Sequence, residues 1–268
     1  MAVAVVTGGA SGFGLALGAS CVARGYSVVL LDRDGERASA EAAALGGDAV
    51  GAACDVGSWS SVSEAAAFVD DRFGVADVVV SNVGVQLFGA VERFTDDEWA
   101  WLLDVNVVGS ARVARAFVPL LRRSSSPRLA FTTSSSILDP AARLGAYQAS
   151  KFAVWGLAET LRLELAADGI AVTVVFPSGM LSRHLETSEA AQPDALRRPI
   201  GDDSDFTAMI ESNPEMASML ASPADAAAAV IDAVLAGERY AITHGDLRAA
   251  VAARSALLAS AAEDAVSE

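Results

Sequence analysis

The chain has 268 residues, of which 53% are hydrophobic, and it carries a formal net charge of -15. This length suits one large α/β domain, and the hydrophobic content excludes disorder as the main state. The negative charge repels nucleic acid and anionic membranes, and no apolar run approaches the roughly 20 residues that span a bilayer. Since the N-terminus also leaves no room for a secretory signal core, we expect a cytoplasmic protein.

Short apolar runs alternate with longer helical segments over the first two thirds of the chain. The predicted strands are residues 2–7, 27–32, 49–54, 77–81, 129–133 and 171–176. The predicted helices run from a glycine turn to about Arg24, then over 36–45, 60–73, about 96–122 and about 147–167. Pro119 is expected to end or bend the fourth helix, and Gly169 to stop the fifth. Continuous apolar strands, each followed by a helix, predict a doubly wound parallel sheet covered on both faces.

The stretch 178–222 breaks this alternation and is rich in Ser, Asp, Glu and Pro. It predicts a long loop with short helices, and loops of this length in a compact domain are usually functional lids or disordered. A helix over 224–235, a strand over 240–243 and a helix over 247–262 follow. We therefore expect a single domain over 1–268, with a substrate-binding lid at about 178–222 and a C-terminal strand and helix at about 238–268.

Glycines crowd the turn between the first predicted strand and helix, Thr7-Gly8-Gly9-Ala10-Ser11-Gly12-Phe13-Gly14. Glycine lets the backbone turn sharply and approach a pyrophosphate, while the helix N-terminus offers free N–H groups and a positive dipole end. A turn with only a structural role would not need glycine at so many positions. The turn therefore indicates a dinucleotide site in a Rossmann-like fold, at the carboxyl ends of the strands.

Asp32 ends the second predicted strand, 18 residues after Gly14. A carboxylate there accepts both ribose hydroxyls of NAD and repels the extra phosphate of NADP. The alternatives are a helix N-cap or a surface acid, and the adjacent Arg33 could accept a 2′-phosphate. We favour NAD over NADP, with Asp55 and Val56, which follow the third strand, beside the adenine.

Tyr147 and Lys151 are four residues apart at the start of a predicted helix, so their side chains share a face. A phenol titrates at about 10, and a nearby ammonium lowers that pKa, which suits proton transfer with a substrate oxygen. The hydroxyls at 132–136 close the strand just upstream, where they either bind the same oxygen or form a plain turn. Asn106 lies within a predicted helix although Asn is a poor helix former. It is either a satisfied core amide or a water-holding member of a proton relay.

In the order and spacing of these residues, the chain resembles the short-chain dehydrogenase/reductase (SDR) family over nearly its whole length. The matching elements are Thr7 to Gly14, Asp55, Ser81-Asn82-Val83-Gly84, Asn106, Ser134, Tyr147, Lys151 and Pro177-Ser178-Gly179-Met180-Leu181-Ser182. The resemblance implies a catalytic tetrad. In it Tyr147 is the general acid/base, Ser134 orients the substrate oxygen, Lys151 lowers the Tyr147 pKa and holds the ribose, and Asn106 anchors a water. Ser134 has the family spacing to Tyr147, with Ser135 as the second choice.

The sequence has two histidines, His184 and His244, and no His/Cys cluster, so we expect no metal site. The resemblance also implies a set of nicotinamide-dinucleotide contacts. The contacts are Gly8, Ser11, Gly12, Phe13, Gly14, Asp32, Arg33, Asp55, Val56, Asn82, Gly84, Tyr147, Lys151, Pro177, Gly179, Met180 and Ser182. Ser81 and Val83 depart from the family's usual Asn and Ala, Ser178 stands where Gly is frequent, and Ser182 replaces a Thr. The family commonly forms homotetramers through two long helices, here about 96–122 and 147–167, so a homo-oligomer (tetramer or dimer) is expected.

The activity implied is hydride transfer between NAD, or NADP as the second choice, and a secondary alcohol or ketone. The alternatives are a catalytically silent sensor or scaffold, and an epimerase or dehydratase with tightly held NAD. The predicted pocket comprises Val85, Gln86, Phe88, Gln148 and residues 137–142 and 180–219. Because these residues include Leu, Met, Phe and Ile, the small-molecule substrate is expected to be mainly apolar or aromatic. Five apolar residues either form the apolar face of a lid helix or pack on the body: Met209, Ile210, Met216, Met219 and Leu220.

Overall fold

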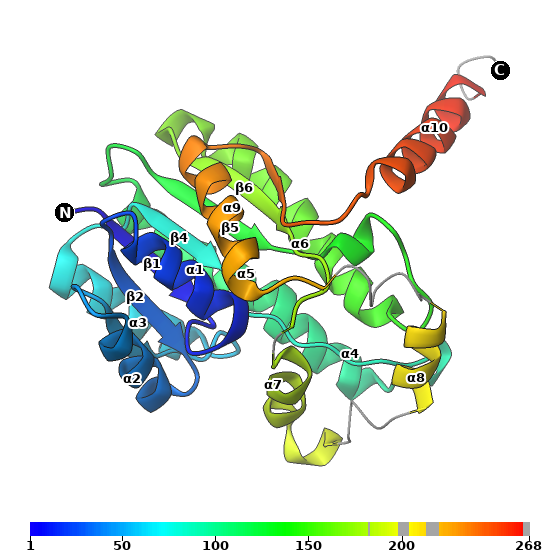
Figure 1. Cartoon of the computed structure of the whole chain (residues 1–268), viewed down its shortest axis with the longest axis horizontal. Coiled ribbons are helices and arrows are strands. Elements are labelled where there is room, and N and C mark those ends of the chain that lie inside the picture. Colours follow the sequence, from blue (N-terminus) through cyan, green and yellow to red (C-terminus); the bar gives the residue numbers. More distant parts are fainter. Residues whose placement is uncertain (182, 198–203, 213–219, 265–268) are drawn as a thin grey trace.

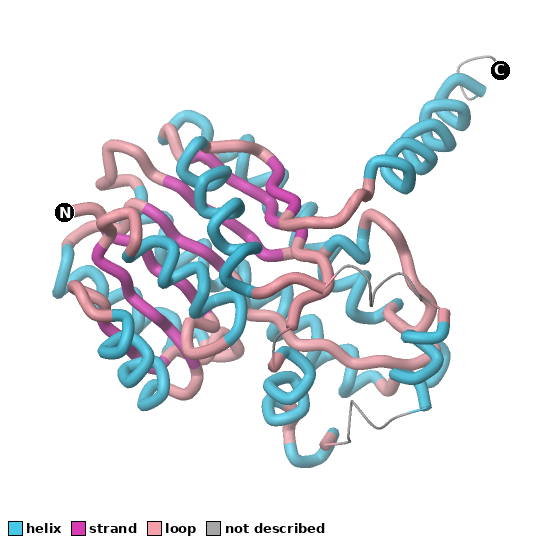
Figure 2. The backbone as a smooth tube through the Cα atoms, in the orientation of Figure 1, coloured by secondary structure: helices cyan, strands magenta, loops and turns pink. Residues whose placement is uncertain are grey.

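One parallel sheet organises the chain in this computed structural model, which describes residues 1–181, 183–197, 204–212 and 220–264. The strands lie in the order β3-β2-β1-β4-β5-β6-β7 (Figures 1 and 2). They are β1 (Val3–Thr7), β2 (Ser27–Asp32), β3 (Val50–Ala53), β4 (Val78–Ser81), β5 (Arg128–Thr132), β6 (Ala171–Phe176) and β7 (Tyr240–Ile242). All neighbouring strands run parallel. The chain order reverses between β1 and β4, the position at which such sheets bind ligands.

Helices cover both faces of the sheet. On one face lie α1 (Gly12–Val22), α2 (Gly35–Leu45) and α9 (Pro223–Ala236), and on the other α3 (Trp59–Phe73), α5 (Gly109–Leu121) and α6 (Gly145–Glu164). Successive strand residues point to opposite faces. Val5 and Val29 therefore join the core under α3 and α5, while Val6 and Leu30 join the core under α1 and α9. Helices thus bury both faces of the sheet, which confirms the predicted doubly wound fold.

Among the described residues, four further α-helices lie outside these two layers. They are α4 (Asp96–Leu103), α7 (His184–Ala191), α8 (Ser204–Glu211) and α10 (Arg248–Asp264). In Figure 1, α4, α7 and α8 lie together at the lower right, whereas α10 projects away from the body. The short helices α7 and α8 fall within the stretch 178–222, as the sequence predicts. No helix in the described ranges is both long and apolar enough to cross a membrane.

The long helix predicted over 96–122 is divided in the structure. A π-helical turn at Asp104–Val108 separates α4 from α5. Helix α5 continues past Pro119 and ends at Leu121, so this irregularity lies at Asn106 rather than at the proline. Gly169 has a φ of 70° just after α6 and the short turn that follows it, where the sequence places a stop.

Both cysteines of the chain, Cys21 and Cys54, are buried and free. Burial raises the pKa of each thiol to about 12. Since the thiolate is the reactive form, both side chains are chemically inert at neutral pH.

Candidate active site and dinucleotide site

The glycine turn after β1 folds back closely on itself. Gly8 has a φ of 65°, which only glycine adopts readily. A Cβ atom on Gly14 would lie 2.0 Å from the Gly8 carbonyl oxygen, so no side chain fits there. The Ser11 side chain makes no capping hydrogen bond at the start of α1, and the first turn of α1 carries no acidic residue. The helix N-terminus therefore suits an external anion, and the turn fits a pyrophosphate.

A hydroxyl group connects β1 to the loop that follows β4. Thr7 Oγ1 accepts hydrogen bonds from the backbone N–H groups of Asn82 (2.9 Å) and Val83 (3.4 Å). The Asn82 side-chain amide donates to the Thr7 carbonyl (3.1 Å) and accepts from the Thr132 hydroxyl (3.2 Å). Together these bonds fix the carboxyl ends of β1, β4 and β5 against one another. Sequence reasoning treated Thr7 only as the first residue of a motif and missed this role.

Asp32 and Arg33 follow each other at the carboxyl end of β2 but face different partners. The Asp32 carboxylate accepts the N–H of Ala10 in the glycine turn (3.1 Å) and that of Asp34 (3.2 Å). It therefore borders the glycine turn. The Arg33 guanidinium instead donates to the Ala190 carbonyl on α7 (3.1 Å).

The other predicted cofactor residues around this edge have local side-chain contacts. The Asp55 carboxylate accepts the N–H of Gly57 (2.9 Å), while Val56 is buried in the core against Gly109. Phe13 packs beside the core under α1. Val56 and Phe13 thus contribute packing in this structure.

The proline-glycine segment after β6 lies between β5 and α9. The Pro177 carbonyl accepts the N–H of Ser135 (2.8 Å), and the Gly179 carbonyl accepts the N–H of Ala221 (3.2 Å). Met180 pairs with Ala221 in an isolated parallel bridge. Ser182, predicted to bind the nicotinamide carboxamide, lies outside the described residues.

Tyr147 and Lys151 occupy the first turns of α6, and both are buried, with 8% and 2% exposure. The Tyr147 hydroxyl is hydrogen-bonded to Ser134, whose hydroxyl also contacts Ser136 (2.9 Å). Lys151 Nζ donates to the Thr132 carbonyl (3.0 Å) and lies 5.8 Å from the centre of the Tyr147 ring. The structure thus brings three predicted catalytic side chains together at the carboxyl end of β5.

Burial dominates the protonation of this pair. It raises the pKa of Tyr147 to about 12, against the opposing effect of the Ser134 hydrogen bond, and it lowers the pKa of Lys151 to about 8. The expectation that Lys151 brings the Tyr147 pKa below its ordinary value is not met in this structure. The Lys151 ammonium points at the Thr132 carbonyl, and both side chains are buried. At neutral pH the phenol is therefore the protonated acid.

Asn106 lies in the π-helical turn and is fully buried. Its side-chain oxygen accepts the N–H of Val85 (2.8 Å), and its amide donates to the Val85 carbonyl (2.9 Å) and the Ser150 hydroxyl (2.9 Å). Both amide donors are therefore used, which favours the satisfied core amide for the side chain. The contacts tie the loop after β4 to α6, between Tyr147 and Lys151.

Helix α8 packs over the side of Tyr147 through an apolar cluster. Met209 and Phe206 from α8 contact Leu87, Phe88 and Tyr147 in this cluster. Met209 is 2% exposed, whereas Ile210 and Leu220 are exposed, and Met216 and Met219 lie outside the described residues. Met209 thus agrees with both alternatives that the sequence left open. It lies on the apolar face of a short helix, and it packs against the body of the protein.

An ion-pair cluster holds the same helix in place. The Asp205 carboxylate, which is buried, pairs with Arg93 (2.5 Å) and Arg143 (3.5 Å). These arginines precede α4 and α6 respectively. The sequence offered no signal for this cluster, because its members are far apart along the chain.

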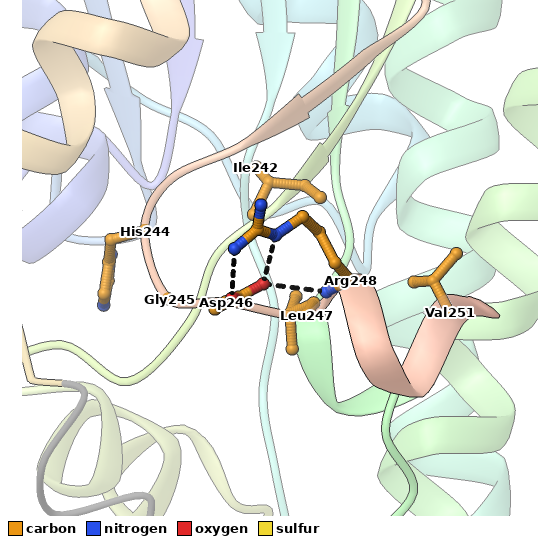
Figure 3. Close-up of a pocket in the computed structure, with 7 residues that line it drawn as sticks. All are labelled: Ile242, His244, Gly245, Asp246, Leu247, Arg248 and Val251. Carbon is orange, nitrogen blue, oxygen red and sulfur yellow. Dashed lines mark hydrogen bonds and ion pairs between the residues drawn. The ribbon is translucent and has the colours of Figure 1, made fainter. Parts of the chain in front are cut away.

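A separate surface cavity of about 510 Å³ lies between β7 and α10 (Figure 3). Asp246 and Arg248 pair with each other across it (2.7 Å), and His244 points away from that pair. None of the predicted catalytic side chains lines it. The predicted catalytic side chains lie instead at the carboxyl end of β5.

Comparison with known proteins identifies the family. The family model for short chain dehydrogenases matches residues 2–193. The chain belongs to this family. This short-chain dehydrogenase is 31% identical to D-threitol dehydrogenase of Mycolicibacterium smegmatis over 202 residues, which cover 74% of this chain and 78% of that protein.

Solved structures show the same fold. The short-chain dehydrogenase superposes on an SDR from Burkholderia phymatum in complex with NAD, with a TM-score of 0.84 and 28% identity, over 93% of this chain and 91% of that one. It also superposes on the NADP active-site complex of Pseudomonas aeruginosa RhlG, with a TM-score of 0.66 and 28% identity, over 73% and 78%. The chain is therefore an SDR oxidoreductase with an NAD(P)-binding fold.

Proposed function

We propose that the protein interconverts a secondary alcohol and a ketone, with Tyr147 as the general acid/base. The observation that carries this proposal is the buried Tyr147 hydroxyl, which is hydrogen-bonded to Ser134 at the carboxyl end of β5, one helical turn from Lys151. When bound, the nicotinamide supplies or accepts the hydride. The residues of the chain handle the proton and the substrate oxygen.

The hydroxyls of Ser134 and Tyr147 have different roles towards the substrate oxygen. Ser134 donates a hydrogen bond that orients it, and Tyr147 gives its proton in the reduction or takes one in the oxidation. The phenolate that results from reduction is stabilised by the Ser134 hydroxyl and by the positive charge of Lys151 near the ring. Asn106 positions α6 through Ser150, so that the Tyr147 hydroxyl faces the substrate.

The apolar cluster around Tyr147 indicates the substrate class. Leu87, Phe88, Phe206 and Met209 surround the phenol with hydrocarbon. Such a lining favours an apolar or aromatic substrate over a phosphorylated one, because burying an unpaired anion there is costly.

The direct test is NADH formation, followed by absorbance, with a panel of apolar and aromatic secondary alcohols and one sugar phosphate for contrast. Turnover of the apolar alcohols is the expected result. A preference for the sugar phosphate would contradict the substrate class. If no alcohol gives NADH while calorimetry still detects NAD binding, the result would favour a sensor. Conversion of substrate without net NADH would favour an epimerase or dehydratase.

We infer a preference for NAD from the position of Asp32 beside the glycine turn. The Asp32→Ala change is expected to raise the ratio of kcat/KM for NADP to that for NAD by about tenfold or more, because it removes repulsion of the 2′-phosphate. Steady-state kinetics with both cofactors measures the ratio. Glu36→Ala, which removes an exposed charge on the neighbouring α2, is the control and should leave the ratio unchanged. An unchanged ratio in Asp32→Ala would contradict this assignment.

The Asp205 ion-pair cluster is proposed to hold α8 over the substrate. We expect Asp205→Asn to raise the KM for the alcohol by about threefold to tenfold with little change in kcat, since partly exposed charged hydrogen bonds contribute modestly. The exposed Glu211 at the end of α8 provides a matched control as Glu211→Gln. If KM stays at the wild-type value in Asp205→Asn, α8 does not depend on this cluster for closure.

A further inference from the structure

Helix α7 is joined to the predicted dinucleotide groove along its length. Near its middle, the buried Ser188 hydroxyl accepts the N–H of Gln86, which follows β4 (3.2 Å). Near its end, the Ala190 carbonyl accepts a hydrogen bond from Arg33 (3.1 Å). At its start, burial and, to a lesser extent, the Lys151 charge lower the His184 pKa to about 4. Hydrogen bonds therefore connect the helix to Arg33, directly after β2, and to Gln86 in the loop after β4.

The Arg33 contact satisfies a carbonyl that the helix itself leaves open. Helix α7 ends at Ala191, and the last four carbonyls of a helix have no partner within it. Arginine at a helix C-terminus satisfies such a carbonyl and complements the negative end of the dipole. The bond from Arg33 to Ala190 and the bond from Gln86 to Ser188 both tie α7 to the sheet edge.

Arg33 also lies next to the residue that we propose to bind the cofactor ribose. It directly follows Asp32, whose carboxylate borders the glycine turn. A guanidinium binds phosphate with two parallel charge-assisted hydrogen bonds, which are stronger than a single bond to a neutral carbonyl. A 2′-phosphate at this position would therefore draw the guanidinium away from Ala190.

We propose that Arg33 is a positioning residue that couples the choice of cofactor to the closure of α7. With NAD, Arg33 holds the Ala190 carbonyl and α7 stays closed over the groove. With NADP, the 2′-phosphate takes the guanidinium and α7 loosens. This inference rests on the proposed dinucleotide site, and it places part of the discrimination against NADP in the closure of the site rather than in cofactor affinity.

Hydrogen exchange followed by mass spectrometry tests the coupling on the full chain. Wild type, Arg33→Gln and Arg37→Gln are each compared free, saturated with NAD and saturated with NADP, with saturation set from calorimetry. Arg37 lies on α2 and pairs with Glu41, so Arg37→Gln is a matched control for loss of a nearby guanidinium. The readout is exchange in peptides that cover residues 184–191.

In wild type, exchange of α7 is expected to be about tenfold faster with NADP than with NAD, the size of effect that one charged hydrogen bond allows. In Arg33→Gln, α7 should exchange at the faster rate in both complexes. Arg37→Gln should behave as wild type, and Arg33→Lys, which keeps a charged donor, should restore the difference between the complexes.

Two results would overturn the inference, and they are distinguishable. If both cofactors bind but α7 exchanges equally fast in the two wild-type complexes, or equally in wild type and Arg33→Gln, the dinucleotide site stands and the coupling is wrong. If calorimetry detects binding of neither cofactor, the proposed function fails and the coupling fails with it.

Discussion

Replacement of Tyr147 by phenylalanine is expected to lower kcat by about 10²- to 10⁴-fold, the range that a positioned acid/base contributes. The ring would keep its place against Leu87, Phe88 and Met209, because only the hydroxyl is removed. Cofactor affinity should therefore stay unchanged. NADH absorbance at saturating alcohol measures the loss of turnover, and calorimetry with NAD checks binding.

A second tyrosine offers a matched control for this change. The Tyr240 hydroxyl donates to Glu159 (2.8 Å) at the exposed β7 edge of the sheet, away from Ser134 and Lys151. Tyr240→Phe removes the same atom and should retain turnover. If Tyr147→Phe turns over as fast as wild type, the phenol is not the proton donor and the proposed mechanism is wrong.

Replacement of Lys151 by methionine is expected to abolish most activity and yet stabilise the fold, by about 2 kcal/mol at pH 7. Burial lowers the Lys151 pKa from its ordinary 10.5 to about 8, so at pH 7 the folded chain carries a desolvated charge. Methionine fills a similar volume without that charge, although the Thr132 carbonyl loses its donor. Urea unfolding of both proteins at pH 7 measures the difference.

The pH dependence of this difference has a definite sign. Between about pH 8 and 10.5 the unfolded chain binds a proton at Lys151 that the folded chain has released. The Lys151 contribution to the stability of wild type therefore rises with pH across this window, and the advantage of Lys151→Met should shrink towards pH 10. A variant less stable than wild type at pH 7 would show that the Thr132 hydrogen bond outweighs the cost of burial.

The parts of the molecule that depend on local pattern could be predicted closely. The apolar run at 27–32 predicts β2 at its observed bounds, and the glycine turn and the Tyr147–Lys151 spacing lead to the same edge of the sheet. These signals are contained within a few residues, so they do not depend on how the rest of the chain packs.

The contacts that close the site could not be predicted. Arg33 reaches Ala190 across 157 positions, and Arg93 reaches Asp205 across 112. Both partners lie in the stretch 178–222, which lacks a regular apolar period. The π-helical turn at Asn106 was likewise hidden, since one poor helix former does not reveal an extra residue in a turn. The spacing of Tyr147 and Lys151 likewise does not reveal that both side chains are buried. Burial is the main cause of the raised Tyr147 pKa.

Lys151 is the only lysine in the chain, so its buried Nζ is the only side-chain amine. Isotope labelling of lysine would therefore give one side-chain signal, which reports on the charge at this position without any mutation. Because this atom is buried, an amine-acylating reagent can reach it only when the surrounding structure opens. The rate at which Lys151 is acylated would therefore measure the opening of the proposed catalytic centre.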